Sequence, residues 1–321
     1  MKRYIPPFIL FFAACAFSTA QEPLKPVKLA TLWTPQAQFA GYYMAQARGF
    51  YKKRGLDVSI VDATPEMPAS YYLRSGKADY AVLWLEQALV LRGKGVNIKN
   101  FAQIVHDSGV FIGVSKKSGI KKPEDLDGRK VGVWPDFGAQ QKAFFRRHGI
   151  HPKIVMQTVS PDIFLRGGVD ALSAMIYDEY HVLYSNGVNP DEMTYFDIAE
   201  PGLNFPEDGL YALAPEVDAD TQTACAFAQA SFEGWRYAFA HPQETVELVV
   251  KRRRAAQLPA TPMHQKWMLA HMEQLVFPRG KAPGILNEDD FASGAQELHA
   301  EGSLRRIPDY EDIFSACSEY E

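Results

Sequence analysis

The sequence predicts an α/β protein with two α/β lobes and extra helices at its C-terminal end. Three observations predict this class. Short β-rich runs alternate with helical segments from Val27 onward, a pattern typical of a parallel sheet covered by helices. The alternation begins again at Lys130 after a break, and from Val217 the sequence is nearly all helical. With 321 residues the chain is long enough for about two domains, each with its own core.

The first α/β unit extends over residues 27–93. Gly55 and Gly76 each follow a helical segment, as C-terminal glycines commonly do. The predicted strands are Val27–Trp33, Asp57–Ala63 and Tyr80–Trp84, and the predicted helices are Gly41–Arg54, Ala69–Ser75 and Glu86–Gly93.

The second unit repeats this order over residues 130–185. Its predicted strands are Lys130–Trp134, Ile154–Val159 and Ala171–Tyr177, and its predicted helices are Gly138–His148, Pro161–Arg166 and Glu179–Ser185. The C-terminal helices are predicted over Gln222–Ala240, Pro242–Ala256, Pro262–Leu275 and Glu288–His299. Because no strand separates these four helices, we expect them to pack on a lobe that is already formed.

Two β-rich segments join the units. Phe101–Val114 leads from the first unit to the second, and Asp208–Leu213 leads back. We interpret them as crossover strands that form the hinge between two lobes. One lobe is then expected from residues 26–110 together with 210–321, and the other from residues 111–209.

Residues 1–20 have the features of a secretory signal peptide. Two basic residues precede an apolar stretch over residues 4–17, and Ser-Thr-Ala at residues 18–20 is a small-x-small cleavage site. The apolar stretch is shorter than the ~20 residues of a membrane-spanning helix. We expect cleavage before Gln21 and export to the periplasm. Lipidation at Cys15 is the alternative, since the run Phe-Ala-Ala-Cys loosely matches a lipobox.

Charge and residue spacing exclude several kinds of partner and site. The 34 basic and 38 acidic residues give a net charge of −4 without a long run of one sign, so no nucleic acid is expected as a partner. The eight His lack metal-ligand spacing, and we expect neither a metal nor a cofactor. His106-Asp107-Ser108 has the residue types of a hydrolase triad, but neighbours on a strand point to opposite faces.

Two cysteines, Cys225 and Cys317, remain outside the predicted signal peptide. In an oxidising compartment they either form a disulfide or stay as two isolated thiols. The sequence does not establish the geometry that a bridge requires.

Candidate ligand-binding residues stand at the carboxyl ends of the predicted parallel strands, where open α/β sheets bind ligands. Four such ends carry aromatic residues, namely Trp33, Trp84, Trp134 and Tyr177. Each could instead cap the core of its sheet, but three of the five Trp at one kind of position favour a binding cleft. The polar residues beside these aromatic residues are Gln36, Gln38, Glu86, Asp136, Asp178 and Glu179.

None of these polar residues is basic. An anion site would need Arg, Lys or free helix N-termini, whereas carboxylates and amides accept hydrogen bonds from ring N–H and amino groups. The cleft is therefore predicted to bind a flat heteroaromatic molecule that donates hydrogen bonds. Each carboxylate could also stabilise a helix N-terminus, which applies above all to Glu86 and Asp178.

Four motifs together resemble a known family. They are WTPQAQFAGYYMAQARGFYKKRGLDVSI from Trp33, KKPEDLDGRKVGVWPDFG from Lys121, SAMIYDEY from Ser173 and FPEDGLYAL from Phe205. Their order and spacing resemble the ABC-importer substrate-binding proteins grouped with thiamine-precursor synthases and with nitrate, sulfonate and taurine binders. The resemblance implies a type II periplasmic binding protein fold.

The resemblance also implies a ligand class. QAQFAGYY and the Tyr-x-Glu-Tyr segment are similar to the branch associated with pyrimidine or riboflavin ligands. In that branch, aromatic residues near Trp33, Tyr42 and Trp84 would stack on the ring and Glu179 would bond its polar edge. Asp178 stands where the resemblance implies Asn, so the ligand itself stays open.

We expect a monomeric solute-binding protein and not an enzyme. It would close its lobes on a small planar heterocycle, such as a thiamine-precursor pyrimidine or a riboflavin-like ring, and present it to the membrane permease of an ABC importer. One alternative is a sensor that docks on a membrane kinase or cyclase. The other is a pyrimidine synthase, which the absence of that enzyme's cysteine-rich segment argues against.

Overall fold

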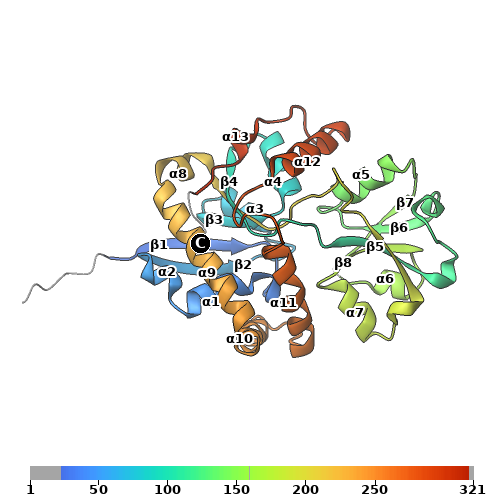
Figure 1. Cartoon of the computed structure of the whole chain (residues 1–321), viewed down its shortest axis with the longest axis horizontal. Helices are drawn as coiled ribbons and strands as arrows, with labels where there is room; N and C mark the ends of the chain where they lie inside the picture. The colour runs from blue at the N-terminus through green and yellow to red at the C-terminus, as the bar shows by residue number, and fades with distance from the viewer. Residues whose placement is uncertain (1–22, 159, 318–321) are drawn as a thin grey trace, which may run out of the picture.

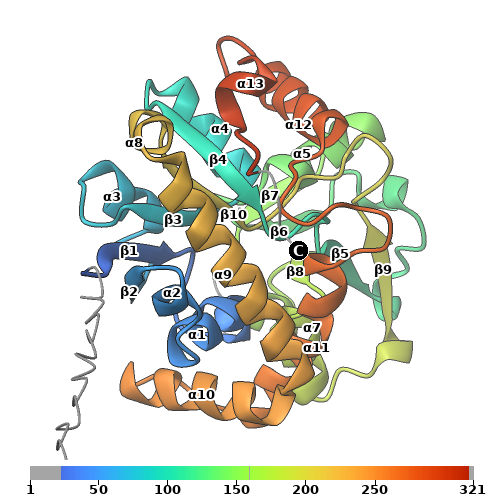
Figure 2. The same cartoon turned by 60° about the vertical axis from the view of Figure 1, so that its left-hand side comes forward.

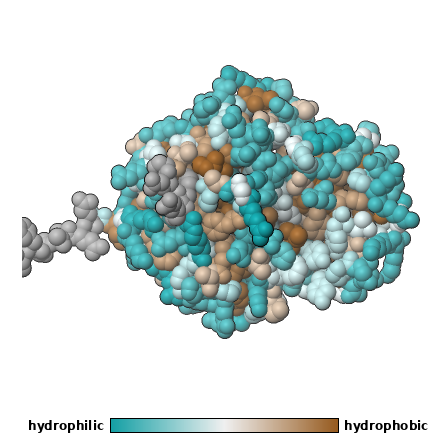
Figure 3. Space-filling view, in the orientation of Figure 1, coloured by the Kyte–Doolittle hydropathy of each residue, from teal (hydrophilic) through white to brown (hydrophobic). Residues whose placement is uncertain are grey.

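The computed structural model describes residues 23–158 and 160–317 (Figure 1). The predicted signal peptide, with Cys15 and the cleavage site before Gln21, lies outside the described residues. Within them, no helix has both the length and the apolar character to cross a bilayer. The face drawn in Figure 3 is mostly hydrophilic over both lobes, and its apolar residues are gathered in patches.

Two five-stranded sheets form two lobes that lie side by side in Figure 1. The sheet of lobe 1 has the order β2-β1-β3-β10-β4, and that of lobe 2 has the order β7-β6-β8-β5-β9. Lobe 1 contains β1 (Lys25–Thr31), β2 (Leu56–Asp62), β3 (Tyr80–Leu83), β4 (Ile98–Gln103) and β10 (Gly209–Leu213). Lobe 2 contains β5 (Val110–Ser115), β6 (Lys130–Val133), β7 (Lys153–Met156), β8 (Ala171–Met175) and β9 (Met193–Asp197).

Both sheets are mixed, so the prediction of parallel sheets was incomplete. β1, β2 and β3 are parallel, as are β6, β7 and β8. β10 runs antiparallel to β3 and β4, and β5 runs antiparallel to β8 and β9. The reason is the path of the chain, since β5 and β10 each arrive from the other lobe. Each therefore begins beside the carboxyl ends of the parallel strands and runs in the opposite direction to them.

The connections between the lobes are links and not continuous strands. β4 ends at Gln103 and β5 begins at Val110, so residues 104–109 divide the predicted crossover strand 101–114 into two strands. Residues 198–208 form the second link, and β10 belongs to lobe 1 alone. The expected lobe limits, residues 26–110 with 210–321 and residues 111–209, stay a prediction.

The helices cover these sheets as the alternation predicted. Those of the first unit are α1 (Ala40–Ala47), α2 (Phe50–Lys53), α3 (Ala69–Arg74) and α4 (Leu85–Gly93), and those of lobe 2 are α5 (Ala139–Arg147), α6 (Asp162–Leu165) and α7 (Glu179–Ser185). The later helices are α8 (Ala214–Ala219), α9 (Thr221–Ala240), α10 (Pro242–Ala255), α11 (Pro262–Val276), α12 (Glu288–Ala300) and α13 (Tyr310–Ile313). The helix predicted over 41–54 is divided at Gly49, whose φ of 73° lies in the left-handed region.

Helix α9 holds the C-terminal helices on lobe 1. Figure 2 shows it crossing the front of the lobe beside α1 and α2. A Cβ at Gly234 of α9 would lie 2.1 Å from the backbone oxygen of Gly41 in α1, so the two backbones meet without side chains between them. Next to this crossing, the indole of Trp235 is completely buried. The close approach fixes where α9 and the helices after it lie.

The two cysteines are joined. Cys225 of α9 and Cys317 near the C-terminus form a disulfide with a Cα–Cα distance of 5.4 Å. Of the two alternatives that the sequence left open, the structure has the bridge. Because both cysteines belong to the lobe 1 side of the chain, the bridge ties the C-terminal segment to that lobe and does not join the two lobes.

Candidate functional site

A cavity lies between the lobes, at the carboxyl ends of β1, β3, β6 and β8. Lobe 1 contributes Leu32, Trp33, Gln36, Gln38 and Trp84, and lobe 2 contributes Trp134, Phe137, Met175, Tyr177, Asp178 and Glu179. The structure thus brings together eight of the eleven candidate residues. In both lobes these residues stand at the carboxyl ends of parallel strands, where open α/β sheets bind ligands, and their contact with a ligand stays a prediction.

Three candidate residues do not line this cavity. Tyr42 of α1 is completely buried in the core, where its ring contacts that of Trp235 edge-on at 6.0 Å. Glu86 points toward lobe 2 and accepts a hydrogen bond from the Ala139 N–H at 3.1 Å. Burial raises the pKa of Glu86 to about 8. Asp136 lines neighbouring hollows of the surface instead.

Aromatic rings form the walls of the cavity. Trp84 is 8% exposed, whereas Trp33 and Trp134 are partly buried. Phe137, which sequence reasoning missed, packs edge-on against Trp84 across the lobes with ring centroids 4.7 Å apart. Its position three residues after Trp134, in the loop that follows β6, is the signal that could have identified it.

A chain of hydrogen bonds begins in the cavity and runs into the second link. Gln36 Nε2 donates to Gln38 Oε1 at 2.6 Å, and Gln38 Nε2 donates to the two carboxylate oxygens of Asp208 at 3.1 and 3.0 Å. The indole N–H of Trp84 also donates to Asp208, at 3.0 Å. Burial raises the pKa of Asp208 to about 7, an effect that these hydrogen bonds oppose. Sequence reasoning did not single out Asp208.

The adjacent Glu207 faces lobe 2. Its carboxylate accepts hydrogen bonds from the Gly109 N–H at 2.5 Å and from the Tyr177 hydroxyl at 2.8 Å. Burial, reinforced by the charge of Asp208, raises the pKa of Glu207 to about 8. The two neighbouring carboxyls of the second link therefore hold cavity residues of both lobes.

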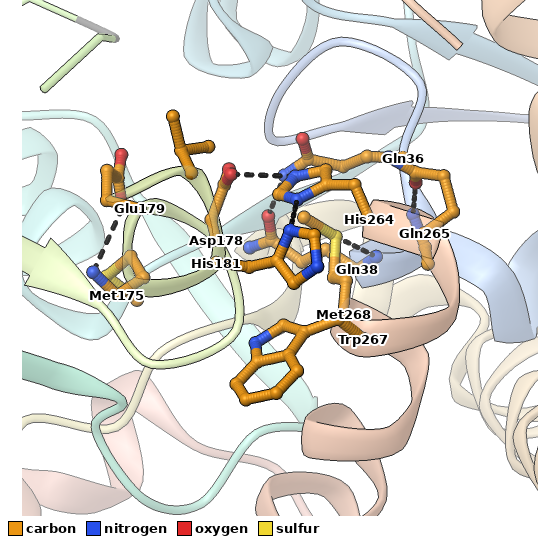
Figure 4. Close-up of polar contacts among 12 residues, drawn as sticks. Gln36, Gln38, Met175, Asp178, Glu179, His181, His264, Gln265, Trp267 and Met268 are labelled. Carbon is orange, nitrogen blue, oxygen red and sulfur yellow. Dashed lines mark hydrogen bonds and ion pairs between the residues drawn. The ribbon is translucent and has the colours of Figure 1, made fainter. Parts of the chain in front are cut away.

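The acidic end of the cavity lies at the start of α7. Glu179 accepts a hydrogen bond from the Met175 N–H at 2.9 Å, and burial raises its pKa well above the usual value, with the charge of Asp178 adding to the effect. Asp178 pairs with His264 Nε2 of α11 at 3.0 Å. His264 Nδ1 lies 3.1 Å from His181 Nδ1, and Figure 4 shows the His264 ring between Asp178 and His181. This contact joins lobe 2 to a C-terminal helix of lobe 1.

The lining of the cavity combines flat aromatic rings with hydrogen-bond acceptors. The lining includes carboxylate and amide oxygens but no Lys or Arg. Among the described residues, no group of three His, Cys, Asp or Glu is suited to hold a metal ion.

Comparison with known proteins identifies the family. A family model described as NMT1/THI5 like matches residues 36–245, which is more than half of the chain. The chain belongs to the NMT1/THI5-like family. The matched segment of this family member includes all of the cavity-lining residues except Leu32 and Trp33.

Among curated proteins, this chain is similar to a binding protein over nearly its whole length and to a synthase over about a third of its length. It is 23% identical to the formylaminopyrimidine-binding protein of Halalkalibacterium halodurans, over 97% of this chain and 96% of that protein. It is 24% identical to the 4-amino-5-hydroxymethyl-2-methylpyrimidine phosphate synthase of Schizosaccharomyces pombe, but only over 35% of this chain and 32% of that enzyme.

Solved structures confirm the predicted fold. The periplasmic aliphatic sulphonate binding protein SsuA from Escherichia coli matches with a TM-score of 0.69 at 17% identity, over 90% of this chain and 96% of that one. A protein from Bordetella bronchiseptica matches with a TM-score of 0.65 at 23% identity, over 91% and 94% of the two chains. The NMT1/THI5-like chain therefore has the periplasmic binding protein fold, with two α/β lobes.

Proposed function

We propose that this NMT1/THI5-like protein is an extracytoplasmic solute-binding protein of an ABC importer, with an aminopyrimidine as its ligand. The observation that carries the proposal is the cavity between the lobes, in which five aromatic rings surround acceptor side chains without a Lys or Arg. Rings stack on a planar ligand, and carboxylate and amide oxygens accept hydrogen bonds from its amino group. Lobe closure would then bury the ligand and present it to a permease.

The nearly full-length similarity to a formylaminopyrimidine-binding protein supports this ligand class. The similarity to pyrimidine phosphate synthases covers about a third of each chain, so binding without a chemical step is the function that we propose. Export by the predicted signal peptide and action as a monomer belong to the same proposal. A sensor that docks on a membrane signalling protein would bind its ligand in the same cavity.

Calorimetric titration of the mature protein tests the proposal. The panel contains 4-amino-5-hydroxymethyl-2-methylpyrimidine, its formylamino relative, riboflavin, taurine, an alkanesulfonate and nitrate. We expect the two aminopyrimidines to bind and the anions to be rejected, because the cavity lining offers no cationic side chain to pair with them. Tight binding of a small anion with no response to either aminopyrimidine would overturn the proposal.

A further inference from the structure

The chain of hydrogen bonds from Gln36 through Gln38 to Asp208 has a direction. All three side chains are buried, with exposed fractions of 6%, 4% and 1%. An ionised carboxylate accepts hydrogen bonds and cannot donate them, whereas a glutamine amide has a donor end and an acceptor end. The group at the buried end of the chain therefore decides which end of each amide faces the cavity.

Asp208 is the group at that end. Its carboxylate accepts from Gln38 Nε2 and from the Trp84 indole, which can only donate. With its NH₂ group turned toward Asp208, Gln38 presents its side-chain carbonyl to Gln36, which donates through Nε2. The side-chain carbonyl oxygen of Gln36 is then the free end of this chain of hydrogen bonds, because it has no hydrogen-bond partner among the residues that the structure describes.

We infer that Asp208 is a specificity-determining residue which, without touching the ligand, turns the Gln36 side-chain carbonyl toward the cavity and so selects ligands that donate an N–H. The inference rests on the proposed function and deepens it, because it states which hydrogen-bonding edge the ligand must present. An aminopyrimidine has such an edge at its exocyclic amino group. A pyrimidinone, which has a carbonyl at that position, would place two acceptors against each other.

The direction of this chain of hydrogen bonds can be reversed. If residue 208 could both accept and donate, it would accept from the Trp84 indole and donate to a flipped Gln38. Gln38 would then donate to Gln36, and the NH₂ group of Gln36 would face the cavity. Asparagine at this position has both abilities, and so does a protonated Asp208.

Protonation of Asp208 falls within an accessible pH range. Its pKa is raised to about 7, chiefly by burial. Asp208 interacts electrostatically with four other titratable groups, which are the carboxyl of Glu207 and the hydroxyls of Tyr42, Tyr177 and Tyr211. Ionised Glu207 would oppose ionisation of Asp208, and none of these groups supplies a positive charge.

The test uses the Asp208→Asn variant and two matched probes. The probes are 4-amino-5-hydroxymethyl-2-methylpyrimidine and its analogue with a carbonyl in place of the 4-amino group. We expect wild-type protein at pH 8.5 to prefer the amino probe, and Asp208→Asn to shift the ratio of the two affinities toward the oxo probe by about 10- to 100-fold. An unchanged ratio in a folded Asp208→Asn protein would overturn the inference.

Glu86→Gln is the matched control. It also removes a buried carboxyl from the region where the lobes meet, but Glu86 does not line the cavity and accepts from the Ala139 N–H instead of from Gln38 or Trp84. A purely structural or charge effect would shift the affinity ratio in both variants, whereas the inference requires the shift in Asp208→Asn alone. Failure of the proposed function can be told apart from failure of this inference, because wild-type protein would then bind neither probe.

A second measurement does not depend on the folding of Asp208→Asn. Lowering the pH from 8.5 to 6 protonates Asp208 and should therefore move the affinity ratio of wild-type protein toward the oxo probe. In Gln38→Met, which breaks the chain of hydrogen bonds, only the titration of the probes and of the other buried carboxyls near the cavity, Glu179 and Glu207, should remain. Equal pH profiles in the wild-type and Gln38→Met proteins would contradict the inference.

Discussion

Trp33 and Trp84 differ in the contacts that hold them, although each follows a parallel strand of lobe 1. Trp84 is nearly buried, donates to Asp208 through its indole N–H and packs against Phe137. Trp33 is partly buried and lines the cavity. Trp84 therefore contributes to the folded core as well as to the cavity, whereas the main role of Trp33 is expected in ligand contact.

Trp33→Ala should accordingly reduce affinity for an aminopyrimidine by ~10- to 100-fold, since one stacking contact contributes about 1–3 kcal/mol. Trp84→Ala should also lower the free energy of unfolding, by about 3–5 kcal/mol, because it opens a cavity and removes one of the donors to Asp208. Calorimetry and urea denaturation of each variant measure the two effects. Unchanged affinity in Trp33→Ala would mean that Trp33 does not contact the ligand.

At the scale of the elements, the crossing of α1 and α9 depends on two glycines. A Cβ at Gly41 would lie 2.3 Å from the Trp235 ring, and one at Gly234 would lie within 3 Å of both the Gly41 carbonyl and the Ala45 nitrogen. The atoms that such a Cβ at Gly234 meets are largely backbone and cannot turn away. Gly294 in α12 differs, because its nearest neighbour, the Leu85 side chain, is at 3.7 Å.

Gly234→Ala should lower the free energy of unfolding by at least about 1–3 kcal/mol, because the helices must move apart. Gly294→Ala is the control within another helix, and it should be neutral or stabilising by up to ~1 kcal/mol, as alanine favours the helical state. Urea denaturation measures both. Equal stability of Gly234→Ala and the wild-type protein would show that the crossing relaxes at no cost.

Elements with a clear periodicity were predictable, and those defined by long-range pairing were not. Trp33 and Trp84 could be placed because a parallel strand directs the residues after it to a known edge of the sheet. The bond between Trp84 and Asp208 joins residues 124 positions apart, and it depends on β10 entering the sheet next to β3. Local sequence does not encode that order. For the same reason, His264 of α11 could not be paired with Asp178 from its own surroundings in the sequence.

At the scale of the whole molecule, buried carboxyls lie where the lobes meet. Glu86 reaches Ala139 across the lobes, and Glu207 and Asp208 occupy the second link. Burial is the main cause that raises their pKa values, to about 8, 8 and 7. A carboxyl with a raised pKa stays protonated in the folded state at pH values where the unfolded chain has released its proton. Its contribution to stability is therefore complete below about pH 4 and is lost as the pH rises through 7–8.

The free energy of unfolding should therefore fall between pH 6.5 and pH 8.5, with a slope of up to about 1.4 kcal/mol per pH unit for each carboxyl still protonated in the folded state. His106, whose pKa burial lowers to about 4, has the opposite effect only below this range. Urea denaturation at a series of pH values measures the slope, and Glu86→Gln should reduce it. A stability that rises over this range would contradict the assignment.

The order of strands in the two sheets also bears on how the chain is made. Every strand of lobe 2 lies in the continuous stretch from Val110 to Asp197, so a nascent chain has that whole sheet available early. In lobe 1, β10 lies between β3 and β4, and β10 emerges only after all of lobe 2. During synthesis, β3 and β4 are therefore made long before the strand that lies between them, and the sheet of lobe 2 can form before the sheet of lobe 1 is complete.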